Sequence, residues 1–312
     1  MSIAEVNRME SSGFTALHVA SSEGHEKIVE LLLAKGASHS TANKHGLMPL
    51  DLAEKDEIKQ LICHRINKTR FVSDSLNWII AATADLQAHQ YSKKLETYGK
   101  DPHVDRLITF IKQNYIEKQL QHIEDIGRIK LCFNKAIHEQ DLVHLLRAYI
   151  AETGFYSVLN THLKKIQLDN LTNDENLGVA YYTGIIAHHP RFETFSFTGT
   201  VFRGMIMTTD DLKQHEIGTR LLTQTFSSAS KQRNVVFDFL AGVDHSKDQL
   251  TTMCTYEIRN QRTALDIHQI SLFECEEEVL LLPYSAFKIM DIQIDKNNSR
   301  HVEIRLKECD SW

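Results

Sequence analysis

Cysteine is scarce in this chain of 312 residues, and the placement of its five cysteines excludes several kinds of site. The cysteines are odd in number and scattered along the chain, and none has the spacing of a metal site. We therefore predict no bound metal and no disulfide framework. Reduced thiols of this kind are typical of an intracellular protein.

The sequence also lacks a basic net charge, a long apolar run and an apolar N-terminus, and each absence excludes a class of protein. The net charge of −6 leaves no basic field, so we predict no nucleic-acid partner. The sequence has no apolar run of about 18 residues, so we predict no membrane span. Residues 1–8 are too polar for a signal peptide, and we expect a cytoplasmic protein. The length suffices for about two domains.

The N-terminal region contains an internal repeat. Residues 13–20 and 46–53 are self-similar at an offset of 33, and residues 24–37 between them supply a second helix and a glycine stop. This pattern resembles the ankyrin repeat, in which Thr15 and His18 would exchange hydrogen bonds, so His18 is expected to be structural. We predict an all-α ankyrin-repeat segment over residues 1–66, one full repeat plus a partial one. Since about three repeats are usually needed for a continuous core, a structural cap is favoured over a site for a protein partner.

Residues 56–165 show a helical pattern and the chain after residue 190 a strand pattern. Residues 76–91 carry apolar side chains at helix spacing, and the proline at position 102 predicts a further helix over 102–122. Farther on, residues 287–294 and 301–306 alternate around a turn cluster, which predicts a β-hairpin. Helices followed by antiparallel strands indicate an α+β domain.

Three short elements carry side chains suited to chemistry. Arg203 lies in the alternating apolar segment 200–207, Ser228 precedes a helix-like stretch, and Glu276 and Glu278 lead into the apolar run 279–282. Taken singly, they are explained by an edge arginine, a helix cap and a solvated strand end. Together, however, residues 276–282 have the pattern of a strand, so we predict that both acids project from one face and repel each other. A fold tolerates such repulsion mainly where the charges have a function.

In this order the three elements resemble the arginine-serine-glutamate class of mono-ADP-ribosyltransferases, which carry an arginine, a Ser-x-Ser and a Glu-x-Glu on successive elements. The resemblance extends over about residues 105–308 and includes the flanking segments 149–160 and 266–271. It implies an α+β fold with an ADP-ribosyltransferase-like two-sheet catalytic domain over residues 105–312. A helical linker over residues 67–104 would precede this domain.

The resemblance also implies roles for the acids. NAD would be the substrate, without a metal, and cleavage of its nicotinamide–ribose bond leaves positive charge on the ribose. Carboxylates stabilise such a state in glycoside hydrolysis. Glu278 would hold the ribose 2′-hydroxyl and face this charge. Glu276 would deprotonate an incoming arginine side chain.

Four further residues would bind NAD. Arg203 would hold the phosphates through its planar fork of donors. Ser228 would hydrogen-bond the Glu278 carboxylate and the nicotinamide ribose, and the Gly204 backbone would take the nicotinamide amide. Phe239 is a candidate for stacking on the nicotinamide, although burial in the core is the ordinary place for phenylalanine and is favoured here.

We therefore predict an NAD(P)-dependent protein-arginine ADP-ribosyltransferase, a glycosyltransferase whose partners are proteins with exposed arginines. Two alternatives remain open at this level. Water could replace arginine as the acceptor, which would make the protein an NAD glycohydrolase. The chain could also be a catalytically silent interaction protein that combines ankyrin and transferase folds, although the presence of all three elements speaks against decay.

Overall fold

The structure is a computed structural model of residues 1–312, and it describes residues 3–39, 41–66, 71–73, 76–123, 126–151, 153–241, 249–271, 274–295 and 298–310. The chain divides into two compact units, Met1–Arg70 and Phe71–Trp312. Each unit has its own hydrophobic core, and each is described separately below.

The first unit is a small all-helical unit, as the repeat pattern predicts. Its helices are α1 (Ile3–Val6), α2 (Ala16–Ser22), α3 (Glu26–Ala34) and α4 (Asp56–Ile66). Gly24, with a φ of 72°, lies in the tight turn between α2 and α3, where a left-handed backbone favours glycine. The core is formed by apolar side chains from all four helices, which include Leu17, Val29 and Ile58.

The start of α2 shows the predicted exchange of hydrogen bonds between Thr15 and His18. The Thr15 backbone N–H donates to His18 Nδ1 over 3.0 Å, and the His18 N–H donates to Thr15 Oγ1 over 3.4 Å, which closes a capping box. Because Nδ1 accepts, the neutral ring carries its proton on Nε2, which donates to the Leu47 carbonyl oxygen over 3.1 Å. His18 thus links the first repeat to the start of the second, and its role is structural.

This buried histidine makes the stability of the first unit depend on pH. Burial lowers the pKa of His18 below its ordinary value, so the unfolded chain binds the proton more tightly than the folded chain. The stabilisation is complete above the unfolded pKa of about 6.5 and decreases as the pH falls below it, by at most about 1.4 kcal/mol per pH unit. Hydrogen exchange in residues 12–47, corrected for its intrinsic pH dependence, should show this loss between pH 7.5 and 5.5. A His45→Ala control, at an exposed site in the same unit, should keep the loss, whereas an equal loss in His18→Gln would contradict the assignment.

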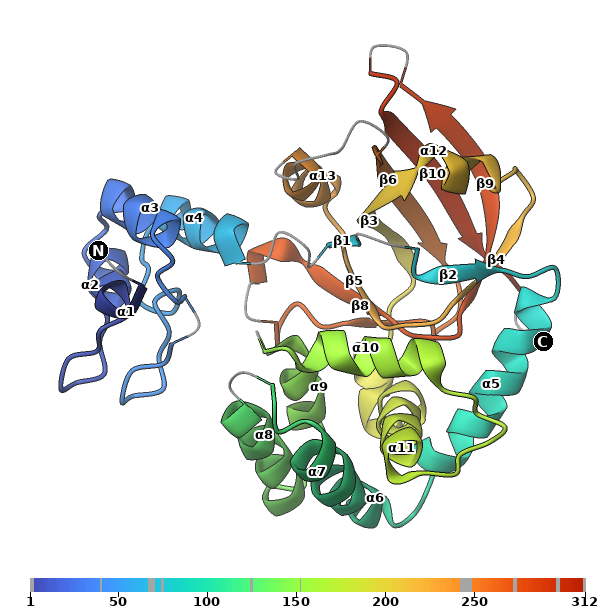
Figure 1. Ribbon diagram of the computed structural model, residues 1–312, viewed down its shortest axis with the longest axis horizontal. Helices are drawn as coiled ribbons and strands as arrows, with labels where there is room; N and C mark the ends of the chain where they lie inside the picture. Colours follow the sequence, from blue (N-terminus) through green and yellow to red (C-terminus); the bar gives the residue numbers. More distant parts are fainter. Residues whose placement is uncertain are drawn as a thin grey trace. The chain divides into compact units, whose positions relative to one another are not determined.

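The second unit begins with two short strands and continues as a layer of helices (Figure 1). The helical part contains an unusual turn, because α6 continues through the π-helical segment Ile111–Ile116 into α7 and so accounts for the helix predicted over 102–122. The helices of this layer are α5 (Ala84–Gly99), α6 (Val104–Phe110), α7 (Glu117–Gln119), α8 (Ile126–His138), α9 (Val143–Ile150), α10 (Phe155–Lys165), α11 (Asp174–His188) and the 3-10 helix Pro190–Phe195.

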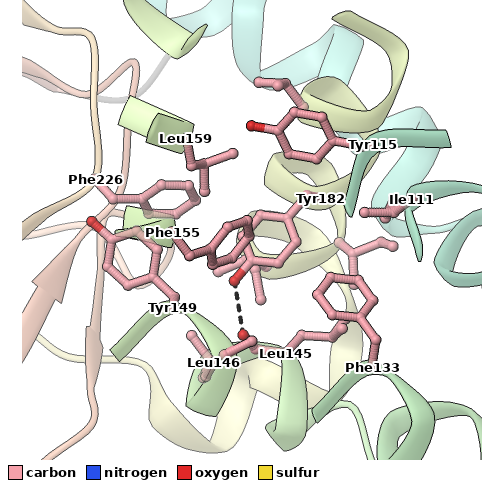
Figure 2. Close-up of a cluster of buried hydrophobic side chains, with 14 of the residues drawn as sticks. Ile111, Tyr115, Phe133, Leu145, Leu146, Tyr149, Phe155, Leu159, Tyr182 and Phe226 are labelled. Atoms are coloured by element: carbon pink, nitrogen blue, oxygen red, sulfur yellow. Dashed lines mark hydrogen bonds between the residues drawn. The ribbon is translucent and has the colours of Figure 1, made fainter. Parts of the chain in front are cut away.

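Aromatic side chains fill the core between these helices and the sheet (Figure 2). Tyr182 of α11 is fully buried and packs edge-on against Phe155 of α10, with ring centroids 5.5 Å apart. Its hydroxyl donates to the Leu145 carbonyl oxygen over 2.8 Å, which satisfies the polar end of a buried ring. Tyr149 of α9 contacts Phe226, which precedes strand β5, so the helical layer is anchored to the start of that strand.

A 10-stranded sheet forms the rest of the unit, in the order β2-β4-β9-β10-β6-β3-β5-β8-β7 with β1 paired to β3. The strands are β1 (Val72–Ser73), β2 (Trp78–Ile80), β3 (Gly199–Thr208), β4 (Arg220–Thr223), β5 (Ser227–Ser230), β6 (Gln249–Ile258), β7 (Ala264–Asp266), β8 (Glu278–Leu281), β9 (Ala286–Ile294) and β10 (His301–Glu308); two further helices are α12 (Thr209–Lys213) and α13 (Arg233–Ala241). Strands β9 and β10 form the predicted hairpin.

The sheet is nearly divided into two at its centre. Strand β3 pairs with β6 along its whole length but with β5 at a single position, Phe202 opposite Ser230. Beyond this joint, β5 continues with β8 and β7. The two predicted sheets are therefore present as two parts of one continuous sheet, and these parts separate next to Arg203.

The predicted helix over residues 76–91 is correct only in its second half. Trp78–Ile80 form strand β2, which pairs with β4, and α5 begins at Ala84. The Trp78 indole N–H donates to His215 Nε2 over 3.0 Å, a tertiary contact that the local pattern does not reveal. Bulky and β-branched residues of this kind favour a strand once a partner strand is available. Residues 71–104, which we expected to form a helical linker, thus contribute two strands and a helix to the second unit.

Among the described residues, no helix combines the length and apolarity needed to cross a membrane.

Candidate active site

Three neighbouring strands carry the predicted site residues. Arg203 lies on β3, Ser228 on β5 and Glu278 at the first position of β8. Since β3, β5 and β8 are adjacent in the sheet, segments 25 and 50 residues apart along the chain meet in one place. The register places Ser230, the second serine of the Ser-x-Ser element, directly opposite Glu278.

Arg203 is buried, with 6% of its surface exposed, and reaches into the gap where β3 and β5 separate. Its side chain starts on the opposite face of β3 from Ser230, because Phe202 is the residue that pairs with Ser230. One guanidinium arm donates to the Ser228 carbonyl oxygen, and the other donates to Ser73 Oγ over 2.6 Å. Burial lowers the pKa of the Arg203 guanidinium, whereas neighbouring ionisable groups, Tyr256 first and Glu278 last, act in the opposite direction.

Glu278 is fully buried and hydrogen-bonded to a hydroxyl group. Ser271 Oγ donates to Glu278 Oε2 over 2.7 Å, and the Ile267 N–H donates to the Glu278 backbone oxygen over 3.1 Å. We expected Ser228 to hold this carboxylate, but Ser228 lies opposite Leu280 and Ser271 makes the contact. The carboxylate orientation is thus fixed by the segment that leads into β8.

The two acids do not share a strand, contrary to the sequence-based prediction. Glu276 ends a 3-10 turn (Glu274–Glu276), and Glu277 has a φ of 43°. The left-handed conformation of Glu277 breaks the alternation, so the positions of the two carboxylates are set by a turn. Ser230 Oγ donates to the Glu276 backbone oxygen over 2.7 Å and fixes this turn to β5. Glu276 is 3% exposed, so both acids are buried.

Gly204 and Phe239 have partners within the protein. The Gly204 N–H donates to the Phe71 carbonyl oxygen over 2.7 Å. A Cβ at position 204 would lie 2.8 Å from side-chain atoms of Val72 and Leu240, so this backbone is closely packed. Phe239 packs edge-on against the Phe71 ring at 5.2 Å between centroids, within an apolar cluster. The core position favoured for Phe239 is the one observed.

Tyr149 is a neighbour of the site that the sequence reasoning did not select. Electrostatic interactions connect its hydroxyl to Arg203 and Glu278, and burial raises its pKa far above the ordinary tyrosine value. Asn160 Nδ2 donates to the Tyr149 hydroxyl over 3.2 Å and to the Phe226 carbonyl oxygen over 3.1 Å. These two residues lie at the ends of the segment 149–160, and they connect the helical layer to the start of β5. Figure 2 shows Tyr149 beside Phe226.

A separate cavity of about 310 Å³ lies at the other end of β8, beside Leu282 and Tyr284. The buried Glu308 lines this cavity and accepts hydrogen bonds from the Arg259 N–H, from Asn260 and from Thr263. These contacts fix the turn between β6 and β7. We therefore assign this carboxylate a structural role.

The described residues contain no group of three or more histidine, cysteine or acidic side chains that could hold a metal ion.

This fold and this set of side chains define an ADP-ribosyltransferase-type domain. The sequence model of the family "NAD:arginine ADP-ribosyltransferase" matches residues 103–311, two thirds of the chain, and the protein belongs to this family. Members of the family use NAD as the donor of ADP-ribose. A second family model, "Ankyrin repeat", matches residues 12–44.

Individual relatives match less of the chain or match it more weakly. Protein phosphatase 1 regulatory subunit 27 of Mus musculus is 36% identical over 53 residues, 17% of this chain, and the human protein is 34% identical over 59 residues, 19% of this chain. The chain spans a little over a third of the length of these curated relatives (34% and 38%). Among solved structures, the Vis toxin of Vibrio splendidus, an ADP-ribosyltransferase, is 18% identical with a TM-score of 0.36, over 72% of this chain and 86% of its own. The type III effector XopAI of Xanthomonas axonopodis pv. citri is 16% identical with a TM-score of 0.44, over 72% and 97%.

Proposed function

We propose that the protein transfers ADP-ribose from NAD to arginine side chains of proteins. The observation that supports this most directly is the convergence of a buried guanidinium on β3, the serine-containing strand β5 and two buried carboxylates, one at the start of β8 and one in the turn before it. The proposal assigns catalysis to Arg203, Ser228, Glu276 and Glu278, and NAD binding to Arg203, Gly204 and Ser228. Phe239 lies in the apolar cluster beside Gly204, and its contact with the nicotinamide stays a prediction.

The reaction breaks one bond and forms one. The bond between the nicotinamide nitrogen and ribose C1 breaks, its electron pair leaves with nicotinamide, and positive charge develops on the ribose. Glu278 stabilises this charge and is ionised to do so. A guanidinium nitrogen of the acceptor then bonds to C1 and gives its proton to Glu276. If this is one direct displacement, the configuration at C1 inverts.

The burial of Glu278 and its hydrogen bond to Ser271 suit this role. A carboxylate in a site that excludes water interacts more strongly with a nearby cation than it would in solvent. A fixed orientation removes the reorganisation that a mobile carboxylate would need during the reaction. Ser271 is therefore proposed as a positioning residue.

Incubation with NAD and agmatine, a small guanidino compound, tests the acceptor. We expect nicotinamide and ADP-ribosyl-agmatine, with the adduct in excess over free ADP-ribose, detected by mass spectrometry. Putrescine, which has an amine in place of the guanidino group, is the matched control and should give no adduct. Free ADP-ribose alone would favour the glycohydrolase, and no nicotinamide at any NAD concentration would favour the silent interaction protein.

The ankyrin-like unit is proposed to act in recruitment or as a cap. An ankyrin repeat is a protein-interaction element, and the first unit is a separate compact part of the chain. The proposed transfer reaction does not depend on this unit.

A further inference from the structure

The edge of β3 beyond Phe202 is occupied by a segment from the start of the second unit. Strand β6 takes one edge of β3 over its whole length, and β5 takes the other edge only at Phe202. Beyond Phe202, β1 pairs with this second edge of β3 in parallel, with Val72 opposite Gly204 and Ser73 opposite Met205. This strand therefore lies in the opening between the two parts of the sheet, next to Arg203.

Phe71 places two chemical groups in this opening. Its carbonyl oxygen accepts the hydrogen bond from the Gly204 N–H over 2.7 Å. Its ring is fully buried and contacts Phe239 edge-on, inside a cluster that also contains Val236 and Leu240 of α13. An aromatic ring beside a carbonyl acceptor is also the chemical pattern of nicotinamide, a planar ring with a carboxamide.

Ser73 engages the second group that the proposed function assigns to NAD. Its hydroxyl accepts from the Arg203 guanidinium over 2.6 Å, while Asn77 Nδ2 donates to the same hydroxyl over 2.5 Å. A phosphate would use the same guanidinium arm. Residues 71–73 thus engage both the Gly204 backbone and Arg203.

We propose that residues 71–73 form an internal plug that fills the nicotinamide subsite, with Phe71 in place of the ring and its carboxamide. This inference rests on the proposed function of the site. Downstream the segment is held by β2, which pairs with β4, and upstream it follows the first unit directly in the chain.

An internal plug acts as a competitor that is always present. NAD binds only to the fraction of molecules in which the plug is out, so the apparent KM for NAD is raised while kcat is unaffected. Removing the Phe71 ring should shift this equilibrium. Burial of a phenylalanine side chain is worth about 1.5–3 kcal/mol, which corresponds to roughly a tenfold to 100-fold change in KM.

The test compares nicotinamide release by the full-length protein and by Phe71→Ala over a range of NAD concentrations. We expect KM to fall at least about tenfold with kcat unchanged. Ile79→Ala, at an exposed position of β2, is the control and should keep the original KM. Equal KM values in active wild type and active Phe71→Ala would overturn the plug and leave the proposed function intact. No release from either protein at any NAD concentration would overturn the proposed function, and the plug with it.

A second measurement does not depend on the folding of Phe71→Ala. Glu278→Gln, which should retain NAD uncleaved, is saturated with NAD as judged by calorimetry, and hydrogen exchange is followed. The backbone amides of residues 72 and 73 should exchange faster with NAD than without it, because the plug leaves β3. Unchanged or slower exchange at these amides under saturation would overturn the plug.

Discussion

Glu278→Gln is expected to lower nicotinamide release from NAD by about 10²–10³-fold, the usual cost of removing one preorganised electrostatic group. The carboxylate is buried at the start of β8 and hydrogen-bonded to Ser271. Its charge is therefore only weakly screened by solvent at the proposed ribose site. Glutamine has the same shape and can still accept the Ser271 hydrogen bond, but it carries no charge. The change therefore removes the proposed stabilisation of the ribose cation and preserves the packing.

The control for this result lies in the same turn. Glu274 is exposed and ends in solvent, so Glu274→Gln should release nicotinamide at the original rate. Thermal unfolding of both variants should stay close to that of the original protein. A Glu278→Gln variant that releases nicotinamide at the wild-type rate would contradict the role of this carboxylate.

The grouping of the site on adjacent strands was predictable from the sequence. Arg203, the serine element and Glu278 each lie in or beside a segment with a strand pattern, and their order along the chain matches that of the resembled family. The structure brings β3, β5 and β8 side by side, with Ser230 opposite Glu278. The strand pattern and the order of the three elements along the chain were enough to predict this grouping, because Arg203, Ser228 and Glu278 each lie within a strand.

The relation between the two acids was not predictable. Strand alternation places Glu276 and Glu278 on one face, but the left-handed Glu277 ends the strand before it reaches Glu276. A glycine or asparagine at position 277 would have signalled such a turn, whereas glutamate rarely adopts it. The conformation is held by tertiary contacts, including the Lys231 N–H that donates to the Glu277 carbonyl oxygen over 3.1 Å.

Contacts between distant parts of the chain also escaped prediction. Ser73 is 130 residues from Arg203, and no local pattern links the two. Tyr149 belongs to a helix whose pattern reports burial but not the strand end that it contacts. The sequence could have pointed to Ser271, since this residue ends the flanking segment 266–271. Its contact with Glu278, however, depends on the turn that precedes β8.

These distant contacts also explain how buried charges are tolerated at this site. A buried ion without compensation would cost several kcal/mol. The Arg203 guanidinium is compensated by Ser73 and the Ser228 carbonyl, and the Glu278 carboxylate by Ser271. If residues 71–73 leave, the guanidinium loses a partner that a phosphate can replace. The plug thus takes the place that the proposal gives to the substrate.

Glu276→Gln is expected to separate the two halves of the reaction. Glu276 is placed beside Glu278 by a turn, and its proposed task is to take a proton from the acceptor. Loss of a general base typically costs about 10²–10⁴-fold, so adduct formation with agmatine should fall by that factor. Cleavage of NAD depends on Glu278, and free ADP-ribose should still form through attack by water.

The measurement is the ratio of ADP-ribosyl-agmatine to free ADP-ribose, which should fall in Glu276→Gln and stay unchanged in Glu274→Gln. The turn should survive the substitution, because Ser230 holds it through the Glu276 backbone oxygen and not through the side chain. An unchanged ratio in Glu276→Gln would show that the acceptor is deprotonated by another group. Loss of both products together would show that the two carboxylates act as one unit, and the division of roles between them would then be wrong.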